Sequence, residues 1–520
     1  MPQDFRLQDT GLINRDKKIK FKFNGKDYFG YEGDTLASAL LANGIHLIGR
    51  SFKYHRPRGF FGAGVDEPNA KMQVVINGHS EPNINATEIE LVDGLSATSQ
   101  NCWPSVEFDV GAINNFLNKF FPAGFYYKTF MWPKSFWYKV YEPFIRKAAG
   151  LGVASLEKDK ERYEHKYEFC DLLVTGSGPA GLASAYSAAK NGAKVILAED
   201  KPRFGGTLLT DDVTIDNLSG KAWADKIISE LKEMPNVLVK NRSQVFGYYD
   251  HNMMVMFERT GDHLEKKSKY KPRQRLWYIR AKEVLLSTGS IERPIVFGNN
   301  DTPGVFLSAA AKEYIKVYGV LVGKKPLIFT NNDSAYETAI EFKKNGVEPI
   351  VLDTREDQNS ELINEAKDLK IDIRFSHAVE AANGYKKVKS ATIGKLNSDK
   401  TDFVSTEVVD CDCICVSGFW TPTVHLASQS GNKLKFNDEI DAFVPDKSKQ
   451  NENSIGSSNG TFTLKETLEN SFKMGAEVSN KITNKNEQIQ LPNTNERKFS
   501  SHDKFWCSPL SKGKNYKRFL

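Results

Sequence analysis

The most constraining feature of this sequence is a glycine-rich turn between an apolar run and an alanine-rich stretch. Residues 171–181 read Asp-Leu-Leu-Val-Thr-Gly-Ser-Gly-Pro-Ala-Gly, and residues 182–189 continue as a helix-forming segment. In such a strand–turn–helix unit, Gly176 permits the tight turn, Gly178 leaves room for a pyrophosphate, and Gly181 lets the helix pack closely on the strand. The positive N-terminal end of the helix then faces the phosphates. The sequence therefore predicts a Rossmann-type dinucleotide site.

A second predicted strand, residues 193–198, ends at two acidic residues, Glu199 and Asp200. A carboxylate about twenty residues beyond the glycine turn commonly accepts a hydrogen bond from the adenosine ribose. We expect Glu199 to do so, which favours NAD over NADP, although Arg203 could accommodate a 2′-phosphate. The pattern admits either NAD or FAD, because both share the ADP half that these residues hold.

Later segments complete the expected site in the order seen in the first nucleotide domain of two-dinucleotide flavoproteins. A Gly-Gly turn follows the acidic strand end, and an apolar strand later closes on Thr288-Gly289. The predicted cofactor-binding residues are Gly176, Gly178, Pro179, Ala180, Gly181, Glu199, Asp200, Arg203, Gly206, Thr207, Val245, Thr288, Gly289, Gly460 and Leu464. We predict no catalytic residue and no metal ligand in this chain.

The length of 520 residues predicts several domains. The expected fold class is α/β, with a two-dinucleotide-type Rossmann domain that carries an inserted second βαβ domain and follows a small ferredoxin-like β-grasp domain. The expected boundaries are 1–110 for the β-grasp domain, 111–165 for a connector, 166–320 and 421–482 for the Rossmann domain, 321–420 for the inserted domain, and 483–520 for a polar tail. The phosphate turn of the inserted domain, residues 331–335, contains no glycine and includes Asp333, which predicts a degenerate nucleotide site.

The expected connector is dense in aromatic residues, including Phe116, Phe130, Trp132, Trp137 and Tyr138. So much aromatic area would make a large exposed apolar patch if it stayed free in water. We expect the connector to be wrapped over its own domains or over a partner subunit.

Composition excludes several classes of function. The net charge of +6 is small for this length, so nothing indicates nucleic-acid binding. The sequence contains no run of about 18 apolar residues, so no membrane span is predicted. The N-terminus lacks the apolar core of a secretory signal. Six cysteines in so long a chain do not form a disulfide framework. We therefore expect a cytoplasmic protein.

Cysteine and histidine placement gives no metal site. The loop of residues 59–70 contains no cysteine and Cys102 stands alone, so we expect no iron–sulfur cluster. Residues 411–415 hold three alternating cysteines in a β-branched run, which predicts an apolar packing stripe. His55 lies in a basic loop that could face a phosphate or a carboxylate, or be salt-bridged internally, and we expect His425 to be a hydrogen-bonded core residue.

Several segments together resemble the alpha subunit of heterotetrameric sarcosine oxidase. They are residues 49–59, 64–70, 121–130, 291–297 with 300–304, and 417–426, and the likeness runs from about residue 18 to 480. The resemblance implies a subunit of a complex that oxidises sarcosine to glycine, passes the one-carbon unit to tetrahydrofolate and gives its electrons to oxygen. It also implies NAD on Gly176, Gly178, Ala180, Gly181, Glu199, Asp200 and Thr207.

The same resemblance implies the partners. FMN would lie at the boundary with a beta-type flavin subunit, FAD would lie within that subunit, and smaller gamma- and delta-type subunits would complete the complex. The isolated chain would be inactive. In that family the alpha subunit continues into a folate-binding domain, whereas this sequence stops at Leu520. We expect that domain to be a separate chain or to be lost.

Two alternatives remain open. One is the alpha subunit of an opine, proline or cyanide-forming amino-acid dehydrogenase, whose members normally carry the cluster cysteines. The other is a structural module in which the nucleotide only stabilises the fold.

Overall fold

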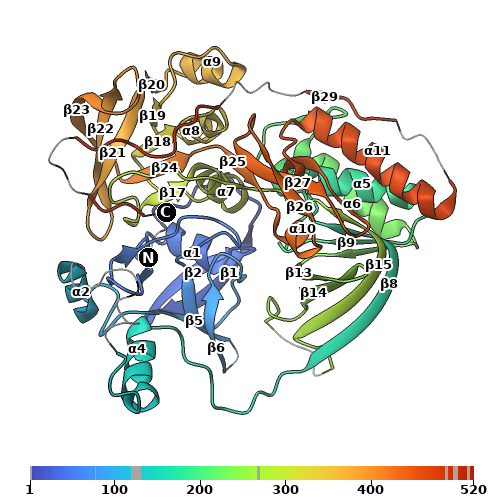
Figure 1. Cartoon of the computed structure of the whole chain (residues 1–520), viewed down its shortest axis with the longest axis horizontal. Helices are drawn as coiled ribbons and strands as arrows, with labels where there is room; N and C mark the ends of the chain where they lie inside the picture. Colours follow the sequence, from blue (N-terminus) through green and yellow to red (C-terminus); the bar gives the residue numbers. More distant parts are fainter. Residues whose placement is uncertain are drawn as a thin grey trace.

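The computed structural model combines three sheet-based units (Figure 1). It describes residues 3–76, 78–118, 124, 130–265, 270–485, 490–495, 502–511, 514 and 516–519. In the described residues, no helix has both the length and the apolar character needed to cross a membrane.

The N-terminal unit is a five-stranded mixed sheet covered by one short helix. Its strand order is β2-β1-β7-β5-β6, with β1 (Asn14–Phe23) parallel to β7 (Leu95–Ser99). The expected hairpin joins β1 to β2 (Lys26–Glu32), and β5 (Lys71–Ile76) pairs with β6 (His79–Asn85). Helix α1 (Leu36–Ala42) begins at Thr35, whose side chain accepts from the Ser38 amide, and all its residues are buried. This arrangement confirms the ferredoxin-like fold.

The Rossmann unit is built on a seven-stranded sheet. The parallel strands are β12 (Val237–Lys240), β9 (Val195–Ala198), β8 (Tyr163–Thr175), β15 (Gln274–Leu286) and β28 (Glu452–Ser454), and β14 (Met253–Arg259) and β13 (Ser243–Tyr249) extend the sheet in antiparallel fashion. Helices α5 (Pro179–Lys190), α6 (Gly220–Glu233) and α11 (Leu464–Thr483) gather beside this sheet (Figure 1). Two apolar clusters contain the inward-facing residues of this unit.

Helix α11 returns from far along the sequence to pack on α5. The Ser187 hydroxyl donates to the Phe472 carbonyl at 2.7 Å, and the Ser479 hydroxyl donates to the Ala188 carbonyl at 3.1 Å. A Cβ at Gly475 would overlap the Ser184 carbonyl. The glycine is needed because the two helices approach so closely at this point.

The second nucleotide unit has a five-stranded parallel sheet in the order β17-β24-β18-β19-β20. Its strands are β17 (Val305–Leu307), β24 (Cys413–Ser417), β18 (Pro326–Thr330), β19 (Ile350–Asp353) and β20 (Asp372–Phe375), and its helices are α7 (Ser308–Tyr318), α8 (Ser334–Lys344) and α9 (Glu361–Asp368). An antiparallel layer of β21 (His377–Gly384), β22 (Val388–Leu396) and β23 (Phe403–Asp410) adjoins it. We expected the inserted domain to begin at residue 321. Because β17 pairs with β24, the first strand of its sheet instead lies before that residue.

Short ribbons join the units. Strand β16 (Ser290–Glu292) pairs with β25 (Trp420–Pro422) between the two nucleotide units, and β25 is followed by α10 (His425–Gln429). Strands β26 (Lys433–Asn437) and β27 (Ala442–Lys447) form a separate hairpin. The apolar core of the N-terminal sheet is continuous with that of the second nucleotide unit.

The aromatic connector contains short helices. They are α2 (Ile113–Phe116), a π-helical turn over Trp137–Tyr141 and α4 (Glu142–Ala149). Among the aromatic residues of the expected connector, Phe120, Phe121, Phe125, Tyr126 and Tyr127 lie outside the described residues, as does most of the motif at 121–130.

Candidate functional site

The glycine-rich turn has the geometry that the sequence predicts. Gly176 has φ +94°, and a Cβ there would overlap the Ser287 carbonyl. A Cβ at Gly181 would overlap the Gly176 carbonyl, whereas one at Gly178 would meet no atom within 4 Å. Two glycines are therefore required by the packing of the protein itself. The third leaves open space beside the backbone, which fits the approach of a pyrophosphate.

Helix α5 starts directly at this open space. Pro179 is its first residue and Ala180 its second, so the helix N-terminus points its positive end at the turn. Gly206 lies against the same place, since a Cβ on it would come within 2.8 Å of the Gly178 Cα. Thr207 follows in the short helix Gly206–Leu209. These residues from two separate turns form one cradle.

Glu199 lies at the tip of β9 with its carboxylate directed at the glycine turn. Its Oε2 accepts from the Ser177 amide at 2.8 Å and the Ser177 hydroxyl at 2.6 Å, and Oε1 accepts from the Lys201 amide at 3.0 Å. Burial, helped by the charge of Asp200, raises the pKa of Glu199. A carboxylate has about four acceptor positions, so Oε1 retains capacity for a ribose hydroxyl. Ser177 is a partner that the sequence did not indicate.

Asp200 is bound within its own unit, whereas Arg203 contacts the N-terminal unit. The Asp200 carbonyl accepts from the Arg259 guanidinium at 2.8 Å. Arg203 donates to the carbonyls of Leu12 at 3.1 Å and Gly33 at 3.2 Å, so it faces the N-terminal unit. To accommodate a 2′-phosphate, the alternative that the sequence left open, Arg203 would have to leave both carbonyls.

The later candidates lie around the carboxyl ends of the sheet. The Thr288 hydroxyl donates to the Thr423 carbonyl at 3.0 Å, and Gly289 has φ +75° with open space around its Cα. Gly460 (φ +82°) ends a turn that begins at Gly456, where a Cβ would lie 2.8 Å from that of Ala180. That turn therefore adjoins the start of α5.

Two candidates are set back from the cradle. Leu464 is the first residue of α11, so it opens the helix that packs along α5. Val245 lies in β13 opposite Met256, and its side chain packs against the apolar cluster of the sheet.

At a pH above the raised pKa of Glu199, where its carboxylate is ionised, Glu199→Ala is expected to weaken NAD binding by roughly 1–3 kcal/mol, the value of a charge-assisted hydrogen bond. Glu199→Gln is the matched control, because its amide oxygen can still accept from the Ser177 amide. Calorimetric titration of both variants with NAD measures the effect. Unchanged affinity in Glu199→Ala would mean that the ribose is held elsewhere.

The raised pKa of Glu199 also predicts a pH dependence. The folded chain retains a proton that the unfolded chain releases, so the free energy of unfolding falls as pH rises from about 4.5 through the raised pKa. The ionised carboxylate is the stronger acceptor, so NAD affinity rises over the same range. Glu199→Gln should flatten this profile, and a flat wild-type profile would argue against contact between Glu199 and NAD.

The second nucleotide turn is closed by its own side chains. Arg355, after β19, donates to Asp333 at 2.8 Å and to Asp353 at 2.7 Å, and all three side chains are buried. The Asn332 side chain accepts from the Ser334 amide at 3.0 Å, at the start of α8. The protein thus supplies its own charge pairing at the turn for which we predict a degenerate nucleotide site.

Residues from near the C-terminus lie across this same turn. The Asp503 amide donates to the Asn331 carbonyl at 2.9 Å, and the Asn331 side chain donates to the Asp503 carbonyl at 2.7 Å. Asp503 also accepts from Thr354 at 3.2 Å and pairs with Lys400. The segment that we expected to be a polar tail is docked here, with Phe505 buried.

The remaining candidates have structural places. His55 Nδ1 lies 2.6 Å from Asp109, and Arg56 and Arg58 both pair with Asp301, so the basic loop is salt-bridged within the chain. His425 begins helix α10 and is exposed, so our expectation of a core residue is wrong: the buried side chains at the start of this helix are the two that follow, Leu426 and Ala427. The cysteines at 411, 413 and 415 are buried in the core. Over the described ranges, no group of three or more His, Cys, Asp or Glu side chains could hold a metal ion.

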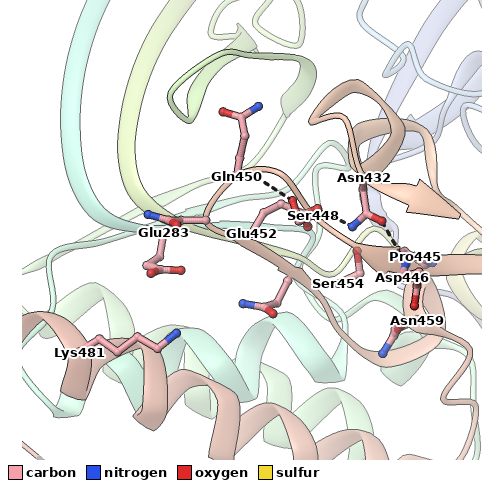
Figure 2. A pocket seen from close by; sticks show the side chains of 12 residues that line it. Glu283, Asn432, Pro445, Asp446, Ser448, Gln450, Glu452, Ser454, Asn459 and Lys481 are labelled. Atoms are coloured by element: carbon pink, nitrogen blue, oxygen red, sulfur yellow. Dashed lines mark hydrogen bonds between the residues drawn. The ribbon is translucent and has the colours of Figure 1, made fainter.

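A separate polar pocket of about 380 Å³ lies between β28 and α11 (Figure 2). Its lining includes Glu283, Gln450, Glu452, Asn459 and Lys481. The residues of the glycine turn are not among those that line it. We therefore separate this pocket from the dinucleotide cradle.

Comparison with known families changes one expectation. Residues 16–102 match the family described as a 2Fe-2S iron-sulfur cluster binding domain. This match contradicts our expectation that the chain has no iron–sulfur cluster. A [2Fe–2S] cluster is usually held by four cysteine thiolates, and Cys102 is the only cysteine between residues 16 and 102. This segment alone does not supply that ligand set, so we assign no reaction step to it.

The loop of residues 59–70 is instead organised around a carboxylate. Buried Glu67 accepts from the amides of Phe61 at 2.6 Å, Gly62 at 2.7 Å and Asn69 at 2.6 Å. Burial raises the pKa of Glu67 to about 7. Burial likewise raises the pKa of the Cys102 thiol to about 11, so this thiol is neutral at physiological pH.

Two curated relatives extend over most of the chain. Sarcosine oxidase subunit alpha of Rhizobium meliloti (strain 1021) is 43% identical over 447 residues, which cover 85% of this chain and 44% of that protein. Sarcosine oxidase subunit alpha of Corynebacterium sp. (strain U-96) is 32% identical, with 86% of this chain and 42% of that protein covered. The chain is thus homologous to these subunits and spans less than half of their length.

A solved structure and a second family match agree with the fold. L-proline dehydrogenase from P. horikoshii superposes with a TM-score of 0.62 at 20% identity, covering 94% of this chain and 77% of that one. Residues 170–453 match the family described as pyridine nucleotide-disulphide oxidoreductase. This match spans more than half of the chain and includes the glycine turn, Glu199 and the sheet of the second nucleotide unit, so the chain belongs to the pyridine nucleotide-disulphide oxidoreductase family.

Proposed function

We propose that this chain is the alpha-type subunit of an oxidoreductase complex that oxidises sarcosine to glycine. The observation that carries the proposal is 43% identity to a sarcosine oxidase subunit alpha over 85% of the chain. The reaction would take place on flavins of a beta-type subunit, with FMN at the boundary and FAD within that subunit. Transfer of the one-carbon unit to tetrahydrofolate and of electrons to oxygen belongs to the same proposal.

Within this complex the chain would hold NAD in the first nucleotide unit. The cradle supports this assignment, because Gly178 leaves open space at the start of α5 and the Oε1 of Glu199 has spare acceptor capacity. When bound, NAD supplies a nicotinamide that can accept or donate a hydride. The glycine turn would position the pyrophosphate, and Glu199 would orient the adenosine ribose.

The complex is expected to form peroxide when supplied with sarcosine, and the isolated chain is expected to form none. The measurement compares the purified chain with the chain co-expressed with a beta-type subunit, using proline and an opine as alternative substrates. Acid extraction of the isolated chain should release NAD. Full activity of the isolated chain, preference for another substrate, or a yellow flavin extract would each contradict part of the proposal.

A further inference from the structure

The connector contains a segment with unusually exposed aromatic side chains. This aromatic segment, residues 130–149, comprises the π-helical turn Trp137–Tyr141 and α4. Trp132 is 83% exposed, Tyr138 82% and Phe144 69%. Figure 1 shows α4 at the outer edge of the molecule, beyond the N-terminal sheet. Large exposed aromatic side chains gathered in one short segment mark a candidate interaction surface.

The exposed rings stand on a fixed base. The Tyr141 hydroxyl donates to the Trp132 carbonyl at 2.8 Å, and the Tyr141 ring contacts those of Phe130 and Phe136. These contacts hold the chain before the helix against the helical turn. The exposed side chains therefore project from an ordered scaffold, and binding would require little further ordering.

The end of the aromatic segment is tied to the N-terminal sheet. The Asn101 amide donates to the Gly150 carbonyl at 3.1 Å. Two residues later, the Gly152 amide donates to Asn83 at 3.1 Å and the Val153 amide to Gln73 at 3.0 Å. The position of α4 relative to the sheet is thereby set.

The chemistry of the surface indicates what would cover it. The aromatic segment carries four cations, Lys134, Lys139, Arg146 and Lys147, and one carboxylate, Glu142, which pairs with Arg146. Tryptophan, tyrosine, phenylalanine and arginine are the residue types enriched at protein interfaces and at their energetic centres. A complementary surface would combine apolar pockets with an acidic rim.

The arrangement of the rings favours a protein over a lipid surface. Phe136, Trp137 and Tyr138 are consecutive and all exposed. Neighbouring residues on a helical turn point about 100° apart, so these three side chains cover several sides of the turn. A lipid surface contacts one face of an interfacial helix, whereas a protein groove can enclose several.

We propose that the aromatic segment is the docking surface for a second subunit, whose matching face is apolar with an acidic rim. This inference rests on the proposed function, because it presupposes a multi-subunit complex. Of the two coverings that we expected for the connector, it favours a partner subunit, since Trp132, Tyr138 and Phe144 are exposed.

The test compares assembly of three forms of the full chain with a co-expressed beta-type subunit. The first is wild type, the second carries Trp132→Ser, Tyr138→Ser and Phe144→Ser, and the control carries Phe436→Ser and Phe443→Ser. The control aromatics are half-exposed on the hairpin of β26 and β27. We expect the triple variant to bind the beta-type subunit with a Kd raised by roughly 100-fold or more, and the control to bind it like wild type. All forms should keep the wild-type thermal midpoint, because the substituted side chains are exposed.

Several outcomes would overturn this docking proposal. The first is that the triple variant assembles with the beta-type subunit as well as wild type does, and the second is that the wild-type chain does not assemble with it at all. The third is that the wild-type chain forms a homodimer that the triple variant, but not the control, disrupts. The fourth is that the wild-type chain and the control bind phosphatidylserine-containing vesicles whereas the triple variant does not. Activity separates this inference from the proposed function. A wild-type complex that assembles but does not oxidise sarcosine contradicts the function alone, and an active complex that tolerates the triple variant contradicts the docking surface alone.

Discussion

Gly178→Ala is expected to fold like the wild-type chain and to lose at least roughly 100-fold in NAD affinity. Gly178 has φ −66°, which alanine adopts freely, and the new Cβ would meet no protein atom within 4 Å. The same Cβ would fill the space that a pyrophosphate needs beside the backbone. Calorimetry measures the affinity, and thermal unfolding confirms that the fold is retained.

Gly181→Ala serves as the matched comparison, because its Cβ would overlap the Gly176 carbonyl in the absence of any ligand. We expect this variant to lose about 3 kcal/mol or more of unfolding free energy, or not to fold. If Gly178→Ala bound NAD as tightly as wild type, the pyrophosphate would lie elsewhere.

Arg355→Ala is expected to lower the free energy of unfolding by about 3–5 kcal/mol. The guanidinium is buried between Asp333 and Asp353, whose side chains are fully buried. Removing one partner of a buried ion pair leaves uncompensated charge in a medium of low polarity. Denaturant unfolding of the full chain measures the loss.

Arg374→Ala is the control for this prediction. Arg374 pairs with Asp372 at 3.0 Å and Glu407 at 2.8 Å, but both carboxylates are about half-exposed or more. Exposed ion pairs contribute about 0–1 kcal/mol, so this variant should unfold almost like wild type. Equal losses in the two variants would contradict the importance of burial at Arg355.

The glycine turn could be predicted from sequence because its requirements are local. Gly176, Gly178 and Gly181 lie within six residues, and the clashes that demand two of them arise within the same strand–turn–helix unit and its adjacent strand. The hairpin of β1 and β2 follows in the same way from Asn24-Gly25, whose residues both adopt positive φ.

Contacts between distant segments could not be predicted in that way. Arg203 was expected near a ribose, but its partners are carbonyls of the N-terminal unit, and no pattern near residue 203 indicates them. Asp503 binds Asn331 across 172 residues of sequence. In both cases the contact depends on how domains meet, which hydrophobic periodicity and turn chemistry do not encode.

The docked C-terminal residues affect how reducing equivalents could enter a complex. A soluble nicotinamide nucleotide that reached the second unit would find Asp503 over the turn and Arg355 between two carboxylates. In the complex that we propose, an NAD held by the first unit would have no second dinucleotide beside it in the described part of this chain with which to exchange a hydride. That proposal then implies that electrons start from the substrate and leave through the flavins of the proposed partner, without passing through the nucleotide of this chain.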